Sequence, residues 1–361
     1  MRIVQLANLY SPVSGGLRTA VDMLGAGYHA AGHRRALVVP GPAYTRRDTE
    51  SGPVITVPGP SVAPGYRLVL DPRPVLRVLG RLRPDVVEVS DKATLTVAAR
   101  WARRRGVRAV LFSHERLDAI LAPRVPSWMP LETLADRWNR RLAAEFDAIV
   151  VTSAFAAAEF ARVGAPSLHR VPLGVDLTTF RPRPPSGHDG VRLVHLGRLS
   201  KEKRPDLAIG AAVELARRGV PVRLDVVGDG PCGPRLREWA RRERLPVRFH
   251  GHVGERAAVA RLLADADVAL ATCPIESFGL AVLEALACGT PVVAADRGAA
   301  HELVVPGAGA RVAPRATAFA DGVQEVLRLP SARRRAAARA RAERYPWTTT
   351  AAGMLDVLTA P

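Results

Sequence analysis

Residues 276–293 of this 361-residue sequence read ESFGLAVLEALACGTPVV. From Leu280 to Cys288 every residue is apolar except Glu284, and a Gly-Thr-Pro turn then leads into a pair of valines. A short apolar helix followed at once by an apolar strand is typical of a parallel α/β sheet. A carboxylate on so apolar a helix is costly to bury unless another group hydrogen-bonds to it. Glu284 is therefore a candidate ligand-binding residue.

The residues just before this helix favour an anion. Ser277 is a capping hydroxyl, and Gly279 allows the backbone to approach a partner closely. Free N–H groups at the start of a helix suit phosphate, and Glu284 lies about 7.5 Å further along the axis. Phosphate at the tip and a hydroxyl-bearing group higher up describe a nucleotide lying along the helix. The alternative is that Glu276 and Glu284 are solvated residues of an ordinary amphipathic helix.

The same alternation of strands and helices runs through the whole sequence. It begins with an apolar strand at 2–7, a loop at 10–16, a helix near 17–31 and a strand at 36–39. Further strands are predicted at 54–57, 86–89, 108–112 and 148–151, and helices near 72–82, 94–105, 130–145 and 153–163. The pattern predicts an α/β fold with parallel sheets that bind ligands at the carboxyl ends of their strands.

A proline-rich segment at 181–187 is the clearest linker, and the pattern restarts after it. Strands follow at 191–196, 222–227, 247–249, 267–271 and 291–294, and helices at 203–218, 232–243, 255–264 and 279–288. An Ala- and Arg-rich tract at 332–344 favours a helix with a solvated face. We therefore predict two doubly wound domains facing a cleft, at 1–180 and 181–345, followed by a final helix within 346–361.

Composition indicates a globular protein with an unusual set of cations. It has 48% hydrophobic and 24% charged residues and a formal net charge of +18. Only three of its 52 basic residues are lysines, namely Lys92, Lys201 and Lys203. A GC-rich coding habit explains this bias most simply, so a position that retains lysine draws attention. The positive charge should attract phosphates, acidic lipid or nucleic acid.

Other features indicate a cytoplasmic protein. The three cysteines, Cys232, Cys273 and Cys288, lie far apart with no CxxC pair, which predicts reduced thiols without a disulfide or metal site. The N-terminus runs directly into an apolar strand with no signal-peptide layout, and no apolar run reaches membrane-spanning length.

Three motifs follow one another at strand-to-helix junctions of the second half. They are G-R-x4-K at 197–203, V-G-x-G-P at 227–231 and E-x7-E at 276–284. Arg198 and Lys203 of the first motif can neutralise a diphosphate without a metal. Alone, two basic residues in so basic a chain mean little, but the ordered series is specific.

With these motifs the sequence resembles retaining glycosyltransferases of the GT-B fold, family 4, over nearly its whole length. The resemblance implies a nucleotide-diphosphate sugar as donor, with Glu276 holding sugar hydroxyls and Glu284 the ribose. It also implies that the final helix crosses back to the first domain. The remaining donor contacts that it implies are the backbone of Phe278, Gly279 and Leu280 at the phosphates, Arg198 and Lys203 at the pyrophosphate, Val253 near the base, and Gly16 facing the diphosphate across the cleft.

Within this family the chain resembles GDP-mannose-dependent phosphatidylinositol mannoside mannosyltransferases, through residues of its first half. The similar stretches are 7–10, 14–22, 88–91, 113–118 and 171–176. The resemblance implies that His114 lines the sugar site. Arg18, at the entry of the first predicted helix, is well placed to meet a phosphate of the acceptor, and Tyr10 is a second candidate acceptor-binding residue. One departure is that relatives often carry a Gly-Gly pair where this sequence has Arg297-Gly298-Ala299.

The expected reaction is transfer of a hexose with retention of configuration and without cofactor or metal. No carboxylate nucleophile emerges, which favours a front-face route in which the leaving phosphate takes the acceptor's proton. Asp265-Ala266-Asp267 imitates a metal-binding DxD, but its place before a predicted strand favours coincidence.

The acceptor side leaves alternatives open. Arginines interleaved with apolar residues at 73–83 predict either contact with an anionic membrane surface or an ordinary surface helix. Rival functions are transfer to a soluble sugar or natural-product acceptor, a GT-B epimerase or phosphorylase, and nucleic-acid binding. Against the last, only 5% of residues are aromatic and no binding module is recognisable.

Overall fold

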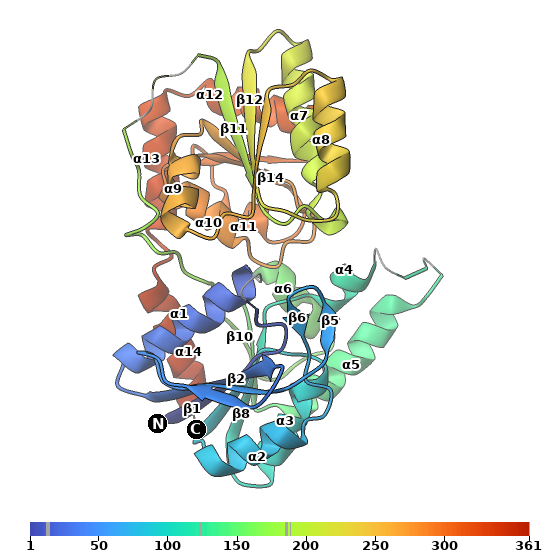
Figure 1. The fold of residues 1–361 in the computed structure, drawn as a ribbon, viewed down its shortest axis with the longest axis vertical. Coiled ribbons are helices and arrows are strands. Elements are labelled where there is room, and N and C mark those ends of the chain that lie inside the picture. Colours follow the sequence, from blue (N-terminus) through green and yellow to red (C-terminus); the bar gives the residue numbers. More distant parts are fainter. Residues whose placement is uncertain (12–14, 123–124, 127, 185–186, 188, 361) are drawn as a thin grey trace. The chain divides into compact units, whose positions relative to one another are not determined.

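The chain forms two compact α/β units in the computed structural model (Figure 1). Unit 1 comprises Met1–Leu173 and Trp347–Pro361, and unit 2 comprises Gly174–Pro346. The structure describes residues 1–11, 15–122, 125–126, 128–184, 187 and 189–360. Parts of the predicted loop at 10–16 and of the predicted linker at 181–187 lie outside these residues. The predicted domain borders, at 180/181 and 345/346, compare with unit borders at 173/174 and 346/347.

Unit 1 is built on a sheet whose described strands run in the order β10-β9-β8-β7-β1-β2-β4-β3. All neighbouring pairs are parallel except β3 with β4. The parallel strands follow chain order outward on both sides of β1, so the sheet reverses its winding between β1 and β7. The strands are β1 (Arg2–Leu6), β2 (Arg34–Gly41), β3 (Thr45–Arg47), β4 (Val54–Pro58), β7 (Val86–Val89), β8 (Arg108–Ser113), β9 (Ala148–Val151) and β10 (Leu168–Arg170), with β5 (Ser61–Ala63) and β6 (Tyr66–Arg67) forming a small separate hairpin.

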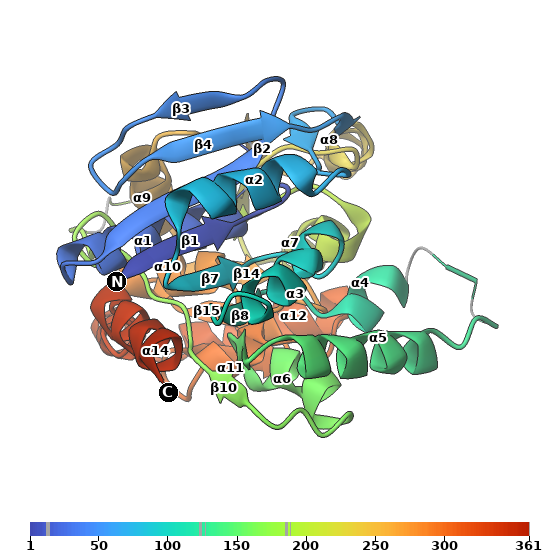
Figure 2. The same cartoon turned by 90° about the horizontal axis from the view of Figure 1, so that it is seen from below.

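Helices cover both faces of this sheet, because successive strand residues point to opposite sides. Val4 and Leu6 pack with residues of α2, α3 and α6, whereas Leu37 and Val39 pack with Val21 of α1. The last helix, α14, belongs to unit 1 and packs on α1, where Gly27 leaves room for Ala351 (Figure 2). The helices are α1 (Gly16–Ala30), α2 (Arg73–Leu82), η1 (Thr94–Thr96), α3 (Val97–Arg103), α4 (Leu117–Leu121), α5 (Leu131–Glu145), α6 (Ala154–Ala161) and α14 (Trp347–Thr359).

Unit 2 repeats this design with a parallel sheet in the order β13-β12-β11-β14-β15-β16. Its winding reverses between β11 and β14, by the same outward chain order. The strands are β11 (Val191–Leu196), β12 (Val222–Val227), β13 (Val247–Gly251), β14 (Val268–Ala271), β15 (Val292–Ala295) and β16 (Gly309–Val312). The helices are η3 (Lys201–Lys203), α7 (Pro205–Arg217), α8 (Gly233–Arg242), α9 (Arg256–Ala264), α10 (Leu280–Ala287), α11 (Ala300–Leu303), α12 (Ala316–Leu327) and α13 (Ser331–Ala342). The predicted class, α/β with two doubly wound units, is confirmed.

The Arg-rich helix α13 differs from the prediction of a solvated face. Arg334 is buried, and Arg335 donates to the carbonyl oxygen of Ala266 at 3.0 Å. Arg339 donates to the carbonyl of Ala287 at the end of α10 and to that of Phe180, both at 3.0 Å. Carbonyls at helix ends lack partners within the helix and carry negative partial charge, which guanidinium groups match. Arg334, Arg335 and Arg339 therefore contact the rest of unit 2, whereas Arg333 lies on the exposed face of the helix.

A buried polar network crosses the centre of unit 1. Glu88 on β7 accepts hydrogen bonds from Tyr28 at 2.6 Å and from Gln5 at 2.9 Å. Arg35 on β2 donates to the side-chain oxygen of Gln5 at 2.7 Å. All four side chains are buried, and burial raises the pKa of Glu88 while Tyr28, Gln5 and Arg35 oppose that shift. The network therefore connects three neighbouring strands, β2, β1 and β7, with helix α1.

Among the described residues, no helix combines the length and apolar character needed to cross a bilayer. The three cysteines are free thiols, as predicted.

Candidate active site

The best-defined polar pair of unit 2 lies where its sheet reverses winding. Lys203 follows β11 and Glu276 follows β14, and these strands are neighbours. The Lys203 Nζ donates to the Glu276 Oε2 at 2.7 Å, and both side chains are partly exposed, by 32% and 24%. In doubly wound sheets this point is the usual position of a ligand. Two residues predicted to hold one donor molecule thus lie in contact.

The backbone on either side of this pair is fixed by its neighbours. The Thr272 hydroxyl donates to the carbonyl oxygen of Lys203 at 2.8 Å. The Cys273 thiol lies 3.2 Å from the carbonyl oxygen of Glu202. Burial alone would lower the pKa of Lys203, but the Glu276 carboxylate outweighs it and the pKa is raised. The ammonium group is therefore held charged at this rim.

The first two glycine motifs form one interlocked turn. A Cβ on Gly228, whose φ is +135°, would lie 2.0 Å from the carbonyl oxygen of Gly197. The Leu199 N–H donates to the carbonyl of Asp229 at 3.0 Å, which joins the two loops. Arg198 lies exposed in this turn. The V-G-x-G-P motif therefore supports the loop that carries Arg198.

The start of α10 is shaped by two glycines. Gly279 precedes the helix with φ +101°, and Phe278 beside it is buried. A Cβ on Gly298, with φ +76°, would lie only 2.7 Å from the Glu276 nitrogen. Ala299 donates its N–H to the Glu276 carbonyl at 2.6 Å. Gly298 and Ala299 thus both contact the Glu276 backbone, and a side chain at position 298 would clash with it.

Substituting Gly298 with alanine should displace Glu276 and weaken donor binding. The left-handed backbone strains any side chain at this position, and the clash with Glu276 adds to it, at a total cost of roughly 1–3 kcal/mol. Gly219→Ala is a matched control, because Gly219 has φ +74° and no atom within 4 Å of a Cβ. Calorimetric titration with the nucleotide checks this. Equal affinities for the two variants would contradict it.

Glu284 lies on α10 with 14% of its side chain exposed. Burial raises its pKa to about 7, Arg256 lowers it and Asp176 raises it further. The Arg256 guanidinium is 3.5 Å from the Glu284 Oε1 and lies over the ring of Phe180 at 4.8 Å. Glu284 is thus neither a solvated residue nor tightly bonded, and its carboxyl group can accept hydrogen bonds from a ligand.

Val253 is half-buried in the loop between β13 and α9. Asp267 of the DxD look-alike directly precedes β14, where it accepts the Arg192 N–H at 2.9 Å and lies 3.5 Å from Arg334. The Asp267 carboxylate thus has a structural role, since it binds the backbone of β11 and lies beside Arg334. Within the described ranges, no group of three or more His, Cys, Asp or Glu side chains has a metal-binding arrangement.

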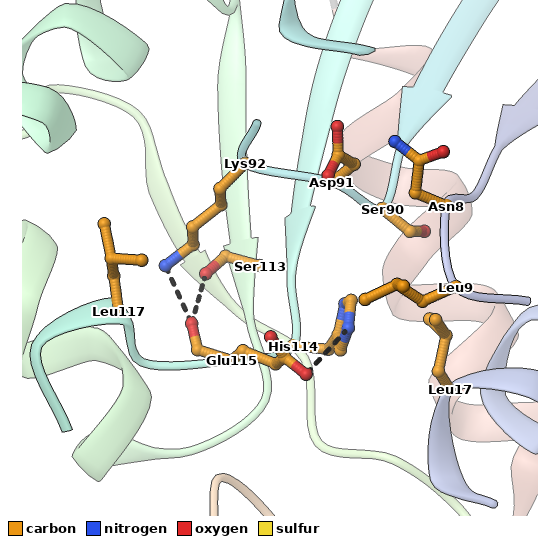
Figure 3. A pocket seen from close by; sticks show the side chains of 10 residues that line it. All are labelled: Asn8, Leu9, Leu17, Ser90, Asp91, Lys92, Ser113, His114, Glu115 and Leu117. Atoms are coloured by element: carbon orange, nitrogen blue, oxygen red, sulfur yellow. Dashed lines mark hydrogen bonds and ion pairs between the residues drawn. The ribbon is translucent and has the colours of Figure 1, made fainter. Parts of the chain in front are cut away.

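Unit 1 carries a pocket where its own sheet reverses winding (Figure 3). His114 follows β8, and its Nε2 lies 3.8 Å from the Glu115 carboxylate. The His114 Nδ1 and the Ser90 Oγ are buried without a hydrogen-bond partner. Such orphaned polar atoms are rare in proteins, and a hydroxyl-bearing ligand would satisfy them. The lining residues are Asn8, Leu9, Leu17, Ser90, Asp91, Lys92, Ser113, His114, Glu115 and Leu117.

The predicted acceptor residues form a separate group at the start of α1. Tyr10 donates to Asp22 at 2.7 Å, and Arg18 lies 3.5 Å from the same carboxylate. Burial and Asp22 raise the pKa of Tyr10 to about 12. Gly16 is the first residue of the helix. Arg18 is partly neutralised here, while 43% of its side chain stays exposed to an incoming anion.

Two family models and a close relative identify the chain. The model of glycosyl transferases group 1 matches residues 178–343, and that of Glycosyltransferase Family 4 matches 14–179. A GDP-mannose-dependent alpha-(1-6)-phosphatidylinositol dimannoside mannosyltransferase of Mycobacterium tuberculosis is 46% identical, over 99% of this chain and 96% of that protein. The chain belongs to glycosyltransferase family 4. It is an enzyme that transfers a sugar.

Solved structures show the GT-B fold of this family 4 glycosyltransferase. Sucrose-phosphate synthase from Thermosynechococcus elongatus has a TM-score of 0.82 at 20% identity, over 99% of this chain and 98% of that one. Anabaena HepE in complex with UDP has a TM-score of 0.78 at 21% identity, over 99% and 100%. The expected GT-B class is therefore confirmed.

Sequence reasoning missed some residues of this glycosyltransferase. Ser90 lies in one of the stretches that carry the family resemblance, but nothing in the sequence indicates that its hydroxyl lacks a partner. Lys92 lines the same pocket and is one of three lysines in an arginine-rich chain, which is the signal that marked Lys203.

Proposed function

We propose that this enzyme transfers mannose from GDP-mannose to a hydroxyl of a phosphatidylinositol mannoside, with retention of configuration. The observation that carries the proposal is the 46% identity, along almost the full length of both chains, to an enzyme of that name. A second relative, a GDP-mannose-dependent phosphatidylinositol monomannoside mannosyltransferase of Mycolicibacterium smegmatis, is 30% identical over 81% of this chain.

In this proposal unit 2 binds the donor through groups described above. Lys203 and Arg198 stabilise the charge that develops on the departing diphosphate, aided by the N–H groups at the start of α10. Glu276, oriented by Lys203, accepts hydrogen bonds from hydroxyl groups of the sugar. Glu284 accepts hydrogen bonds from those of the ribose. Val253 lies near the base. With these cations in place, the reaction needs neither metal nor cofactor.

Unit 1 supplies the remaining groups. His114 contacts the transferring sugar, Gly16 approaches the diphosphate, and Tyr10 with Arg18 meets the phosphate of the acceptor. The unpartnered polar atoms of His114 and Ser90 support this role, because sugar hydroxyls both donate and accept hydrogen bonds.

Transfer assays with matched donors and acceptors test the proposal. We expect labelled GDP-mannose, but not UDP-glucose, to give a labelled glycolipid when phosphatidylinositol mannoside is supplied. Transfer only to a soluble sugar or inositol phosphate would favour the soluble-acceptor alternative. Absence of transfer from GDP-mannose to any of these acceptors would overturn the proposal.

Donor affinity should depend on the ionisation of Glu284. Because its pKa is about 7, the carboxyl group is largely protonated below that pH and accepts ribose hydroxyls best above it. The Kd for GDP-mannose, whose diphosphate has no ionisation in this range, should fall several-fold between about pH 6 and about pH 8. Glu284→Gln should flatten this dependence in calorimetric titrations. A slope that persists in the variant would assign it to another group.

The same shift has a consequence for folding. The pKa of Glu284 in the folded protein lies above its ordinary value of 4.5. Its contribution to stability is therefore fully present below about pH 4.5 and is lost as the pH rises through 7.

Contact with an anionic membrane would bring this enzyme to its lipid acceptor. The apolar side chains Val75, Val78 and Leu79 of α2 are buried in the unit, whereas Arg73, Arg77, Arg81 and Arg83 are exposed. Such a helix attracts anionic lipid by charge rather than by insertion.

We therefore expect salt-sensitive binding to vesicles that contain phosphatidylinositol. Arg77→Glu with Arg81→Glu should weaken it, since each basic residue near the surface contributes about 1 kcal/mol. Arg235→Glu with Arg242→Glu is the control, with equal charge change at exposed positions of α8. Vesicle co-sedimentation measures the binding. An equal loss of binding in both variants would show that it depends on the net charge of the protein rather than on α2.

A further inference from the structure

Lys92 is a largely buried cation that donor binding in unit 2 does not use. It follows β7, and only 11% of its side chain is exposed. Its Nζ donates to the carboxylate of Glu159 on α6 and, at 2.7 Å, to the carbonyl oxygen of Glu115. The ring of Phe160 lies 4.7 Å from the same ammonium group. The Trp138 indole donates to the Lys92 carbonyl at 2.8 Å, which fixes its backbone.

Glu159 holds the other side of the same loop. Its side chain is fully buried, and its second oxygen accepts the Leu117 N–H at 3.0 Å and the Asn139 amide at 3.2 Å. The Lys92–Glu159 pair is therefore hydrogen-bonded to the backbone at Glu115 and at Leu117. Figure 3 shows Lys92 and Ser113 converging on the Glu115 carbonyl, with the Ser113 Oγ at 3.3 Å.

His114 lies immediately before residues 115–117, whose backbone is hydrogen-bonded to this pair. Its Nδ1 has no hydrogen-bond partner, its Nε2 lies 3.8 Å from the Glu115 carboxylate, and its ring lies 5.9 Å from that of Phe112. None of these contacts is a hydrogen bond, so the position of the imidazole depends in large part on the backbone that carries it. That backbone is held by the buried pair.

We propose that Lys92 and Glu159 position His114 for sugar transfer, acting through the 115–117 backbone. The proposal rests on the role of His114 in the proposed function. Fold stability alone explains the pair poorly, because apolar residues of similar volume are often at least as stabilising as a buried ion pair. The lysine also has a reason to persist among arginines. Its compact ammonium group serves a carboxylate, a carbonyl and a ring face in different directions, which a planar guanidinium does not.

The test uses Lys92→Met with Glu159→Gln, in the full-length enzyme. Lys92→Met alone would leave a buried carboxylate unpaired and endanger folding, whereas the double change removes both charges and nearly keeps both shapes. We expect an unchanged melting temperature within a few degrees, an unchanged KM for the nucleotide sugar and a kcat lowered roughly 10- to 100-fold. Arg105→Met is the control, because Arg105 also lies over an aromatic ring of unit 1, that of Trp101 at 4.6 Å.

The decisive measurement combines the pair with His114→Ala. If the pair acts through His114, it lowers kcat little further in the His114→Ala background. Multiplying effects would overturn the positioning proposal while leaving the role of His114 intact. If His114→Ala leaves transfer unchanged, the role of His114 in the proposed function is wrong, and the positioning proposal falls with it.

Hydrogen exchange gives a readout that needs no acceptor. Peptides covering 113–119 should exchange faster in the double variant than in the wild type, since the Leu117 N–H loses a charged partner. The control variant should match the wild type. Unchanged exchange in the double variant would show that the pair does not hold the loop, and would overturn the proposal.

Discussion

Lys203→Ala is expected to lower kcat roughly 10³-fold, with a smaller effect on folding than on turnover. The ammonium group lies 2.7 Å from Glu276 and is held charged by it. Removal takes away a charge that stabilises the leaving diphosphate and frees the Glu276 carboxylate from its orienting partner. Because the loss falls mainly on the transition state, kcat should fall much more than donor KM rises.

Lys201→Ala provides the matched control for this prediction. Lys201 lies in the same short helix, η3, but its side chain is exposed. Each variant loses one lysine charge from the same helical turn, so the change in net charge is the same in both. Steady-state transfer kinetics should show near-normal turnover for Lys201→Ala. Near-normal turnover for Lys203→Ala would remove the proposed charge stabilisation from this site.

Much of the fold could be predicted from the sequence, because parallel strands buried on both faces appear as short apolar runs. β9, β14 and β15 are such runs, and the helices between the strands follow from their length and spacing. The sequence predicts no element between residues 295 and 331, where the structure has α11, β16 and α12, and the first two of these are only four residues long. Short elements of this kind are defined by their neighbours rather than by their own residues.

The site could be predicted to the level of the strand ends, but not to the level of side-chain partners. The rule that ligands bind beyond the carboxyl ends of strands placed Lys203 and Glu276 on one rim, although they lie 73 residues apart in sequence. Nothing in one sequence gives the partner of Lys92 on α6, or the close approach of Gly298 to Glu276. Such contacts depend on how distant segments pack.

The second large effect is expected in the core of unit 1. Arg35→Met should lower the free energy of unfolding by about 3–5 kcal/mol, the usual cost of removing one partner from a buried charged network. Arg35 is 4% exposed and bonded to Gln5, and its positive charge lowers the pKa of the buried Glu88. Without it, the Glu88 pKa, already raised, should rise further.

This gives the destabilisation a definite pH dependence. The folded variant binds a proton at Glu88 more tightly than the unfolded chain does, so its stability should increase as the pH falls from neutral toward about 5. Adding Glu88→Gln should recover much of the loss at neutral pH, because no carboxylate is then buried without a counter-charge. Hydrogen exchange at β1 and β7 measures these changes within unit 1.

Arg46→Met is the control for this prediction, since the Arg46–Asp48 pair is exposed, with 57% and 75% of the two side chains accessible. Exposed pairs contribute at most about 1 kcal/mol, and its loss should not depend on Glu88. If Arg35→Met costs no more than Arg46→Met, or costs the same at pH 5 and at pH 8, the guanidinium is not what stabilises Glu88. The hydrogen bonds from Tyr28 and Gln5 would then be what stabilises the Glu88 carboxylate.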